Sequence, residues 1–395
     1  MSRALEHFTY NSVVPDLRGG DRVIALDAQI RQLLRQCKMP SSYIELDYQT
    51  EPSFFAALAI YGHEHDLVLI QPDNPGGLTG LGIRSVRRAY LGGVPTDIGY
   101  LHHLRFHPSI RGGSFLARGY RAFREIFKKK PLQVTLTSIL EDNISARNLL
   151  ESNRVGGGMP EYQPLSKFLT LLIPLNGPGK RWPLRYREIP NSSAYTVRGL
   201  TEIDLPSLLS LFKQSGRDND GVPVLVTEDF RGSTTGALAG LKISDMIGVF
   251  ASEEMVGAIG IWNQMSYRQI VVSHLCRSLA AIRATWQAGS GFFGDCPIPP
   301  TGAPVNFVLL DPWVIKPGRE REIMPILLKA GTKAAKKRGA LFAALGVASE
   351  NPAVKAVDTL FYMSYYSIIY QVFWPENGCY DFNKKQMHIA NLGAL

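Results

Sequence analysis

Two parts of this chain repeat the same order of features at a constant distance. Pro108 and Pro317 each follow an apolar, strand-like segment, and Asn143 and Asn351 each follow the next such segment. The two offsets are 209 and 208 residues. Between the markers, both parts are predicted to contain a loop, a helix and a strand. A matching order at one offset is typical of a duplicated domain.

The length of the chain agrees with a duplication. It has 395 residues, enough for two or three domains. Residues 174–193 carry four prolines and four basic residues, a composition that can pack no core of its own. We therefore predict a first domain over 1–173, a linker over 174–193 and a second domain over 194–395.

Both predicted domains mix helices with strands. In the first, helical apolar spacing covers 23–37 and 116–127, and 145–152 is a short helix. The strands predicted for the first domain are 67–70, 80–89, 97–106, 132–139 and 167–175. In the second domain the helices predicted are 205–212, 322–337 and 353–360, and the strands are 246–250, 256–262, 305–315, 341–347 and 367–374. The order indicates an α/β fold with a mixed sheet in each domain.

Composition excludes several classes of protein. Apolar residues make up 45% and charged residues 19%, which excludes a disordered chain. The net charge of +9 favours acidic partners without choosing among them. The four scattered cysteines favour a reducing compartment over a disulfide framework. With no apolar run near ~20 residues, we expect a cytoplasmic protein without a membrane partner.

The segment over 100–116 is the most informative about chemistry. It contains a strand, the glycine turn Arg111-Gly112-Gly113-Ser114 and the beginning of a helix. A glycine turn entering a helix presents main-chain N–H groups and the positive end of the helix dipole, which suits a phosphate group. Arg111 adds a cation at the edge of this turn.

This segment resembles the phosphate loop of the GNAT superfamily of N-acetyltransferases, which has the pattern Arg/Gln-x-x-Gly-x-Gly/Ala. Arg111 matches, whereas Ser114 and Leu116 replace the two motif glycines. The family also carries Asn-x-x-Ala-x-x-Leu-Tyr after its fifth strand. Residues 143–150 read Asn-Ile-Ser-Ala-Arg-Asn-Leu-Leu, so Leu150 replaces the tyrosine. The resemblance is best over residues 84–154.

The resemblance implies two tandem GNAT-like acyl-CoA N-acyltransferase domains, with acetyl-CoA or another acyl-CoA as co-substrate. The acceptor would be an amine of a small molecule or peptide. The pyrophosphate would be held by Arg111, Gly112, Gly113, Ser114, Phe115 and Leu116. The main chain at Leu104 and Phe106 would hold the pantetheine arm and polarise the carbonyl, and Asn143 would contact the cofactor arm.

The acid and base of such a reaction are less determined. The family often places a glutamate base on this strand, where this chain has His102 and His103. A face shared with Tyr100 and Leu104 favours His102 as the catalytic base, although a structural role for both histidines is the alternative. In the family that tyrosine is often the acid that protonates the leaving thiolate; without it, Ser145, Tyr120 or water would have to serve, or no group does. Since adjacent strand residues face opposite ways, we expect no metal at these histidines.

The second domain lacks the phosphate loop. Residues 316–322 contain one glycine, Gly318, and two acidic residues, Glu320 and Glu322, where a pyrophosphate would lie. We predict a degenerate copy that keeps the fold, binds CoA poorly or not at all, and completes the acceptor site or an interface.

Two other functions remain open. One is an acyl-CoA-binding or regulatory module without catalysis, which the absent tyrosine favours. The other is a transferase that takes its donor from aminoacyl-tRNA, which the charge permits. No aromatic and basic RNA-binding motif is present, so nucleic acid is not the expected partner. The acyl-chain length and the oligomeric state are not determined.

The phosphate loop yields a direct prediction. A CoA species should remain bound through purification and be detected by mass spectrometry, and substituting Arg111 and Gly113 should abolish that retention. Unchanged retention in the substituted protein would show that the loop is misassigned.

Overall fold

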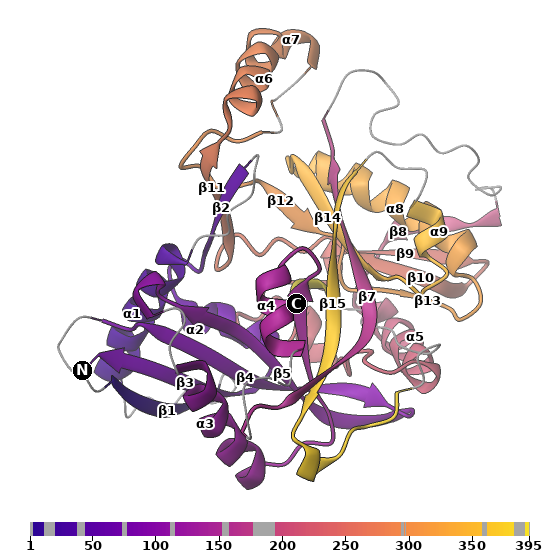
Figure 1. The fold of residues 1–395 in the computed structure, drawn as a ribbon. Helices are drawn as coiled ribbons and strands as arrows, with labels where there is room; N and C mark the ends of the chain where they lie inside the picture. The colour runs from indigo at the N-terminus through magenta and orange to yellow at the C-terminus, as the bar shows by residue number, and fades with distance from the viewer. Residues whose placement is uncertain are drawn as a thin grey trace.

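A computed structural model describes most of the chain (Figure 1). The described residues are 3–11, 20–37, 44–72, 77–110, 115–151, 158–176, 194–293, 296, 298–357, 362–382 and 392–394. The predicted linker lies largely outside this range. All structural statements below concern these residues.

The first half alternates strands and helices in the predicted order. Its strands are β1 (Arg3–Asn11), β2 (Ile44–Gln49), β3 (Glu64–Pro72), β4 (Gly80–Leu91), β5 (Val94–Phe106), β6 (Thr135–Leu140) and β7 (Glu161–Pro174). Its helices are α1 (Gly20–Gln36), α2 (Phe54–Leu58), α3 (Phe115–Lys129) and α4 (Ile144–Glu151). Every strand and helix predicted for this half is confirmed, with ends shifted by a few residues.

The second half repeats the pattern. Its strands are β8 (Thr196–Gly199), β9 (Met246–Ala251), β10 (Glu254–Gly260), β11 (Gln269–Leu275), β12 (Phe307–Leu309), β13 (Trp313–Ile315), β14 (Phe342–Ala348) and β15 (Met363–Phe373). Its helices are α5 (Leu205–Asp218), α6 (Arg277–Ala288), α7 (Ser290–Phe293), α8 (Glu320–Lys337) and α9 (Val354–Val357). Strand, α3, strand, α4, strand in the first half corresponds to strand, α8, strand, α9, strand in the second.

The two halves exchange strands within one sheet. Nine strands lie in the order β1-β3-β4-β5-β6-β15-β7-β14-β12. The last strand of the second half, β15, pairs antiparallel with β6 and with β7 of the first half. In turn, β7 pairs antiparallel with β14 of the second half. Figure 1 shows β7 and β15 crossing the centre of the molecule side by side. Each half therefore depends on the other for hydrogen-bond partners.

Two smaller sheets complete the fold. A four-stranded sheet, β13-β10-β9-β8, belongs to the second half and is covered by α8. A two-stranded sheet joins β11 of the second half to β2 of the first. In Figure 1, α6 and α7 stand beyond this pair, away from the larger sheets.

Helices cover both faces of the first half. Helix α3 buries Tyr120, Phe123, Ile126 and Phe127 against one face, as its apolar spacing predicts. Pro131 follows the helix, and Lys128 and Lys129 lie in its last turn, where cations suit the helix dipole. Helices α1 and α2 cover the opposite face in a separate apolar cluster.

A buried ion pair fastens α3 to the sheet. The Arg84 guanidinium on β4 donates to the Asp66 carboxylate on β3 at 2.8 Å, and neither side chain is exposed. The same guanidinium donates to the carbonyl of Lys130 at 2.9 Å, directly after α3. Its charge also lies 5.0 Å from the centre of the Phe127 ring. These contacts fix the C-terminal end of α3 over β3 and β4.

The predicted strand over 305–315 is wrong as a single element. It divides into β12, which pairs with β14 in the nine-stranded sheet, and β13, which pairs with β10 in the four-stranded sheet. The change of partner occurs at Asp311 and Pro312: the Asp311 N–H donates to Gly260, and proline has no N–H to continue a ladder. The strands β1, β2, β8 and β11 and the helices α2, α6 and α7 were not predicted.

The residues that the structure describes include no helix that is both long enough and apolar enough to cross a bilayer.

The strand exchange predicts that the halves do not fold alone. Residues 1–176 without β15 leave the edges of β6 and β7 unpaired, and residues 194–395 leave β14 and β15 without β7. We expect each fragment to aggregate or to lack a cooperative thermal transition by circular dichroism, and co-expression to restore one soluble complex. A fragment that melts cooperatively by itself would contradict this.

Candidate functional site

The strands β5 and β6 separate at the centre of the nine-stranded sheet. Their parallel pairing covers only Gly99 to Leu101 on β5 and Thr135 to Thr137 on β6. Beyond these residues β5 continues to Phe106 and β6 to Leu140 without pairing to each other. The main chain of β5 after Leu101 therefore has one edge that faces no strand, next to the N-terminal end of α3.

A β-bulge lies at the point of separation. The pairing of β5 with β4 shifts between His102, which lies opposite Ile83, and Arg105, which lies opposite Leu81. His103 has a φ of 51°, a left-handed conformation that is uncommon outside glycine. The extra residue breaks the alternation of side chains.

Because of the bulge, the predicted distribution of side chains over the two faces of β5 is wrong. His102 and His103 lie on the same side, with their Nδ1 atoms 2.5 Å apart, instead of facing opposite ways. Leu104 does not share the face of Tyr100 and His102 as expected. It lies on the opposite side, among residues that pack against α3.

The main-chain N–H of Phe106 faces the open edge. The His107 N–H donates to the Thr79 carbonyl at 2.9 Å, on the β4 side of the strand. Because successive residues of a strand alternate in direction, the Phe106 N–H points away from β4. Leu104 belongs to the bulge, where strand alternation does not give the direction of its N–H group. The Phe106 N–H thus lines the gap between β5 and β6, and the assignment of Leu104 and Phe106 to CoA stays a prediction.

The structure describes only some of the other predicted cofactor residues. Arg111, Gly112, Gly113 and Ser114 lie outside the described residues. Phe115 and Leu116 form the beginning of α3. Asn143 is exposed and caps α4, where its side-chain oxygen accepts from the Ala146 N–H at 3.2 Å. Its predicted role at the cofactor is not tested by this cap.

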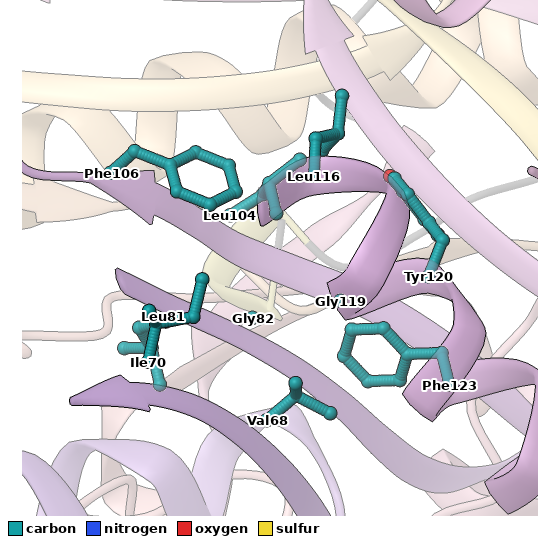
Figure 2. A pocket seen from close by; sticks show the side chains of 10 residues that line it. All are labelled: Val68, Ile70, Leu81, Gly82, Leu104, Phe106, Leu116, Gly119, Tyr120 and Phe123. Carbon is teal, nitrogen blue, oxygen red and sulfur yellow. The ribbon is translucent and has the colours of Figure 1, made fainter. Parts of the chain in front are cut away.

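An apolar hollow lies between α3 and the sheet (Figure 2). Its lining comes from β3, β4, β5 and α3: Val68, Ile70, Leu81, Gly82, Leu104, Phe106, Leu116, Gly119, Tyr120 and Phe123. The side chains of Leu104 and Phe106 thus point under α3, while the Phe106 N–H points into the gap. At Gly82 a Cβ atom would lie 3.0 Å from the Phe123 ring, so glycine permits this close packing.

Four polar side chains form a hydrogen-bonded chain on the opposite face. His65 on β3 contacts the Ser85 hydroxyl on β4 through Nδ1 at 2.7 Å. The same hydroxyl contacts His102 Nε2 at 2.6 Å, and His102 Nδ1 contacts His103 Nδ1. His65 and Ser85 are fully buried. Both ring nitrogens of His102 are therefore engaged by protein groups, and His103 is the last member of the chain.

Aromatic rings enclose the two histidines. Tyr61 stacks on His102 with ring centres 4.3 Å apart, and the Tyr100 ring lies nearly parallel to His102 at 5.3 Å. The edges or faces of Tyr48, Phe54 and Tyr61 surround His103 at 5.4–5.7 Å. Phe54 is placed by α2, which Ser53 caps through a hydrogen bond to the Ala56 N–H.

Burial keeps the three histidines of this hydrogen-bonded network neutral. It lowers the pKa of His65 to about 3. Burial also holds the pKa of His102 well below its usual value, with the neighbouring His103 and His65 as further causes. For His103 the causes are burial and then the cations of Arg105 and Arg268. At neutral pH each ring therefore carries one proton and one lone pair.

The second half contributes to this face. The Arg268 guanidinium lies 5.3 Å from the Tyr48 ring centre and donates to the Gly393 carbonyl at 2.8 Å. The Gly393 N–H donates to the buried carboxyl of Asp311, whose pKa burial raises to about 7. The Arg87 guanidinium on β4 reaches the Ala394 carbonyl. Residues 392–394 thus join both halves beside the histidines.

The residues considered for thiolate protonation lie on the α3 side. Leu150, in place of the family tyrosine, is buried in the apolar cluster under α3 and α4. The Tyr120 hydroxyl lines the hollow and forms a hydrogen bond with the Tyr162 hydroxyl, and burial raises the pKa of Tyr120 to about 12. Ser145 is exposed on α4.

Within the described part of the chain, His, Cys, Asp and Glu side chains form no group of three or more arranged for a metal ion.

The corresponding place in the second half differs in charge. Glu320 and Glu322 lie in the first turn of α8. The Glu320 carboxylate accepts from the Gly318 N–H at 3.2 Å, and Glu322 accepts from Arg319 and Tyr195. The carboxylates of Glu320 and Glu322 are therefore already paired with the main-chain N–H and the arginine that an anionic ligand would need.

The sequence indicated only part of this site. The histidine pair and the open strand edge follow from the segment over 100–116. Ser85, Tyr61 and Arg268 were missed, because their contacts join β4, a short helical turn and the second half. Alternation along 80–89 could have placed Ser85 on the α1 face, but nothing in the sequence pairs it with His102.

Comparisons with solved structures support the same fold. Saccharomyces cerevisiae N-myristoyltransferase with bound myristoyl-CoA is 13% identical, with a TM-score of 0.55 over 99% of this chain and 85% of that chain. A tandem GNAT protein from the clavulanic acid biosynthesis pathway is 10% identical, with a TM-score of 0.52 over 96% and 100%. A GCN5-related N-acetyltransferase from Sphaerobacter thermophilus is 14% identical, with a TM-score of 0.51 over 92% and 95%.

No family model and no curated protein matches the sequence. At these identities the structural likeness shows the fold. The predicted mixed α/β fold is confirmed, and it is similar to the fold of a tandem GNAT protein.

The buried histidines predict a loss of stability in acid. An unfolded histidine binds a proton near pH 6.5, whereas folded His65 stays neutral down to about pH 3. Between these values the unfolded state binds more protons, so the free energy of unfolding falls as the pH is lowered. For His65 the fall between pH 7 and pH 5 is roughly 2 kcal/mol.

Urea unfolding at pH 7 and pH 5 measures this fall. The variant His65→Gln cannot titrate and should show a smaller decline than the wild type by roughly this amount. His274→Gln, at an exposed position on β11, should decline as the wild type does. Equal declines in wild type and His65→Gln would contradict the prediction.

Proposed function

We propose that this chain is an N-acyltransferase that moves an acyl group from acetyl-CoA, or from another acyl-CoA, to an amine of a small molecule or peptide. The observation that carries the proposal is the gap between β5 and β6, with the Phe106 N–H on its edge. An extended pantetheine arm contains amide groups that can pair with such a strand edge.

The pyrophosphate of the acyl-CoA would lie at one end of this gap, and its thioester would lie at the other end. Arg111 to Ser114, followed by Phe115 and Leu116 at the beginning of α3, would hold the pyrophosphate at a helix N-terminus. The thioester would lie where β5 and β6 separate, close to the bulge at His103. The bound myristoyl-CoA of the yeast neighbour supports an acyl-CoA donor in this fold, and the acyl-chain length here stays open.

Direct transfer needs three things from the protein. The acceptor nitrogen must be neutral, the thioester carbonyl must be polarised, and the leaving thiolate must receive a proton. Main-chain N–H groups at Leu104 and Phe106 would stabilise negative charge on the carbonyl oxygen, an effect for which single donors contribute on the order of 10²–10³ in rate. The pair of His102 and His103, neutral at pH 7, would take the proton of the amine.

The second half would serve the acceptor side. Arg268 and residues 392–394 reach the face that carries the histidines, opposite α3 and the apolar hollow. The carboxylates Glu320 and Glu322 would disfavour CoA in the second copy. One acyl-CoA per chain is therefore expected, with the amine approaching from the α1 and α2 face.

A binding module without turnover is the second candidate. Leu150 in place of the family tyrosine, and a buried Tyr120 hydroxyl already bonded to Tyr162, favour it. A thiol has an ordinary pKa near ~8.5, so transfer does not strictly require a protein acid. The two candidates differ in whether an amine releases free CoA.

The test combines binding and turnover on the full chain. Acetyl-CoA and longer acyl-CoAs should raise the melting temperature, and a panel of amines should then release free thiol. The variant Arg111→Glu should lose the stabilisation, whereas Arg321→Glu, at an exposed position at the beginning of α8, should keep it.

For turnover, His102→Gln should lower kcat by about 10²-fold or more, and the exposed control His274→Gln should not. Stabilisation without thiol release from any amine would favour the binding module. No stabilisation by any acyl-CoA would refute both.

A further inference from the structure

We infer that the acyl acceptor carries an anionic group, a carboxylate or a phosphate, and that Arg105 and Arg268 bind this group while the amine lies at the histidine pair. The inference rests on the proposed acyl transfer and names the class of its acceptor. Arg105 and Arg268 would determine specificity, and neither would take part in proton transfer.

Arg105 lies on the face of β5 that carries the histidines. After the bulge the register is regular again, with Arg105 opposite Leu81 and Phe106 opposite Gly80. The Phe106 side chain points under α3, so the side chain of the preceding strand residue points to the other face. In agreement with this position, burial and then the charge of Arg105 lower the pKa of His103.

The contacts of Arg105 leave room for an anion. In the described part of the chain, its guanidinium donates to the Leu104 carbonyl at 3.2 Å and pairs with no carboxylate. Its side chain is only partly exposed. A planar guanidinium in such a place can donate two parallel N–H bonds to a carboxylate or phosphate group.

Arg268 brings a second cation to the same face from the second half. It directly precedes β11, which pairs with β2, and its guanidinium carbon lies 5.3 Å from the centre of the Tyr48 ring on β2. The same ring lies 5.7 Å from the His103 ring, so one aromatic ring separates the cation from the histidine. Neutral groups hold Arg268 in place, the Gly393 carbonyl at 2.8 Å and the Gln264 side chain at 3.3 Å.

The carboxylates that neighbour these residues do not supply the opposite charge here. Glu51 forms ion pairs with two arginines of α1. Asp311 is buried and accepts from the N–H of residue 393. Asp47 directly precedes Tyr48 on β2, so its side chain faces the other way. The described surroundings of His103 therefore carry a surplus of positive charge.

This surplus selects among amines. Two cations repel a protonated amine that has no anionic group, whereas an acceptor with a carboxylate or phosphate brings the compensating charge. The same cations lower the pKa of an amine bound beside them, which favours the neutral nucleophile that the transfer needs. Tyr48, His103, Arg105 and Arg268 are all partly exposed, so a ligand can reach them from solvent.

Matched pairs of amines test the inference on the full chain. With the acyl-CoA that stabilises the protein most as donor, kcat/KM is measured for L-phenylalanine against L-phenylalaninamide and for O-phosphoethanolamine against ethanolamine. The anionic member of at least one pair should be preferred by about 10-fold or more. The pair that responds tells a carboxylate from a phosphate. Because the amide has the less basic amine, a preference for the amino acid cannot arise from amine protonation.

Variants assign the preference to the arginines. Arg105→Gln and Arg268→Gln should each lower kcat/KM for the anionic member by about 10-fold or more, with little effect on the neutral member. Arg88→Gln is the matched control, since Arg88 is an exposed strand arginine that pairs with Asp97, and it should leave the preference unchanged. Added salt should weaken the preference in the wild type, which decides even if a variant does not fold.

The outcomes separate this inference from the proposed function. Turnover confined to amines without an anionic group, or an undiminished preference in folded Arg105→Gln and Arg268→Gln, would overturn the inference and leave the acyl transfer intact. If no amine is acylated, the proposed function fails and binding alone judges the anion site. The anionic member of a pair should then raise the melting temperature more than its neutral partner, and equal shifts in both pairs would overturn the inference.

Discussion

The insertion of β15 between β6 and β7 is the constraint on which the rest of the structure depends. It joins the last strand of the chain to the centre of the first half, and in exchange β7 pairs with β14 of the second half. The backbone hydrogen bonds of one half cannot be satisfied without the other. The exchange also holds Arg268 and residues 392–394 against the face of β4 and β5 that carries the histidines.

Next to this exchange of strands, the sheet is open between β5 and β6 of the first half. Pairing of β5 with β6 stops after Leu101. The bulge at His103 changes the direction of the following side chains, so the two faces of β5 carry different kinds of residue. One edge presents the Phe106 N–H. One face presents apolar side chains to α3, and the other presents the buried polar network of the histidines. A single irregular residue thus separates an apolar side of β5 from a polar side.

The two halves share a fold but differ in chemistry. The sequence directly before α3 contains Arg111 and two glycines, whereas before α8 the Glu320 carboxylate accepts from the Gly318 N–H. A carboxylate at a helix N-terminus satisfies the same donors that a phosphate would use. The first half therefore keeps an open strand edge, and the second half completes the sheet and the polar face.

Hydrophobic spacing in the sequence determined most helices and strands, because the periods of 3.6 and 2 residues are local properties of the chain. The repeat at 209 residues and the segment over 100–116 determined the duplication and the place of the gap. The sequence could not determine that His102 and His103 lie on one side, because alternation fails at a bulge that depends on pairing with β4. Nor could it join Ser85 and Arg268 to these histidines, since strand register and the exchange of β15 bring together residues far apart in the chain, and only the tertiary structure decides both.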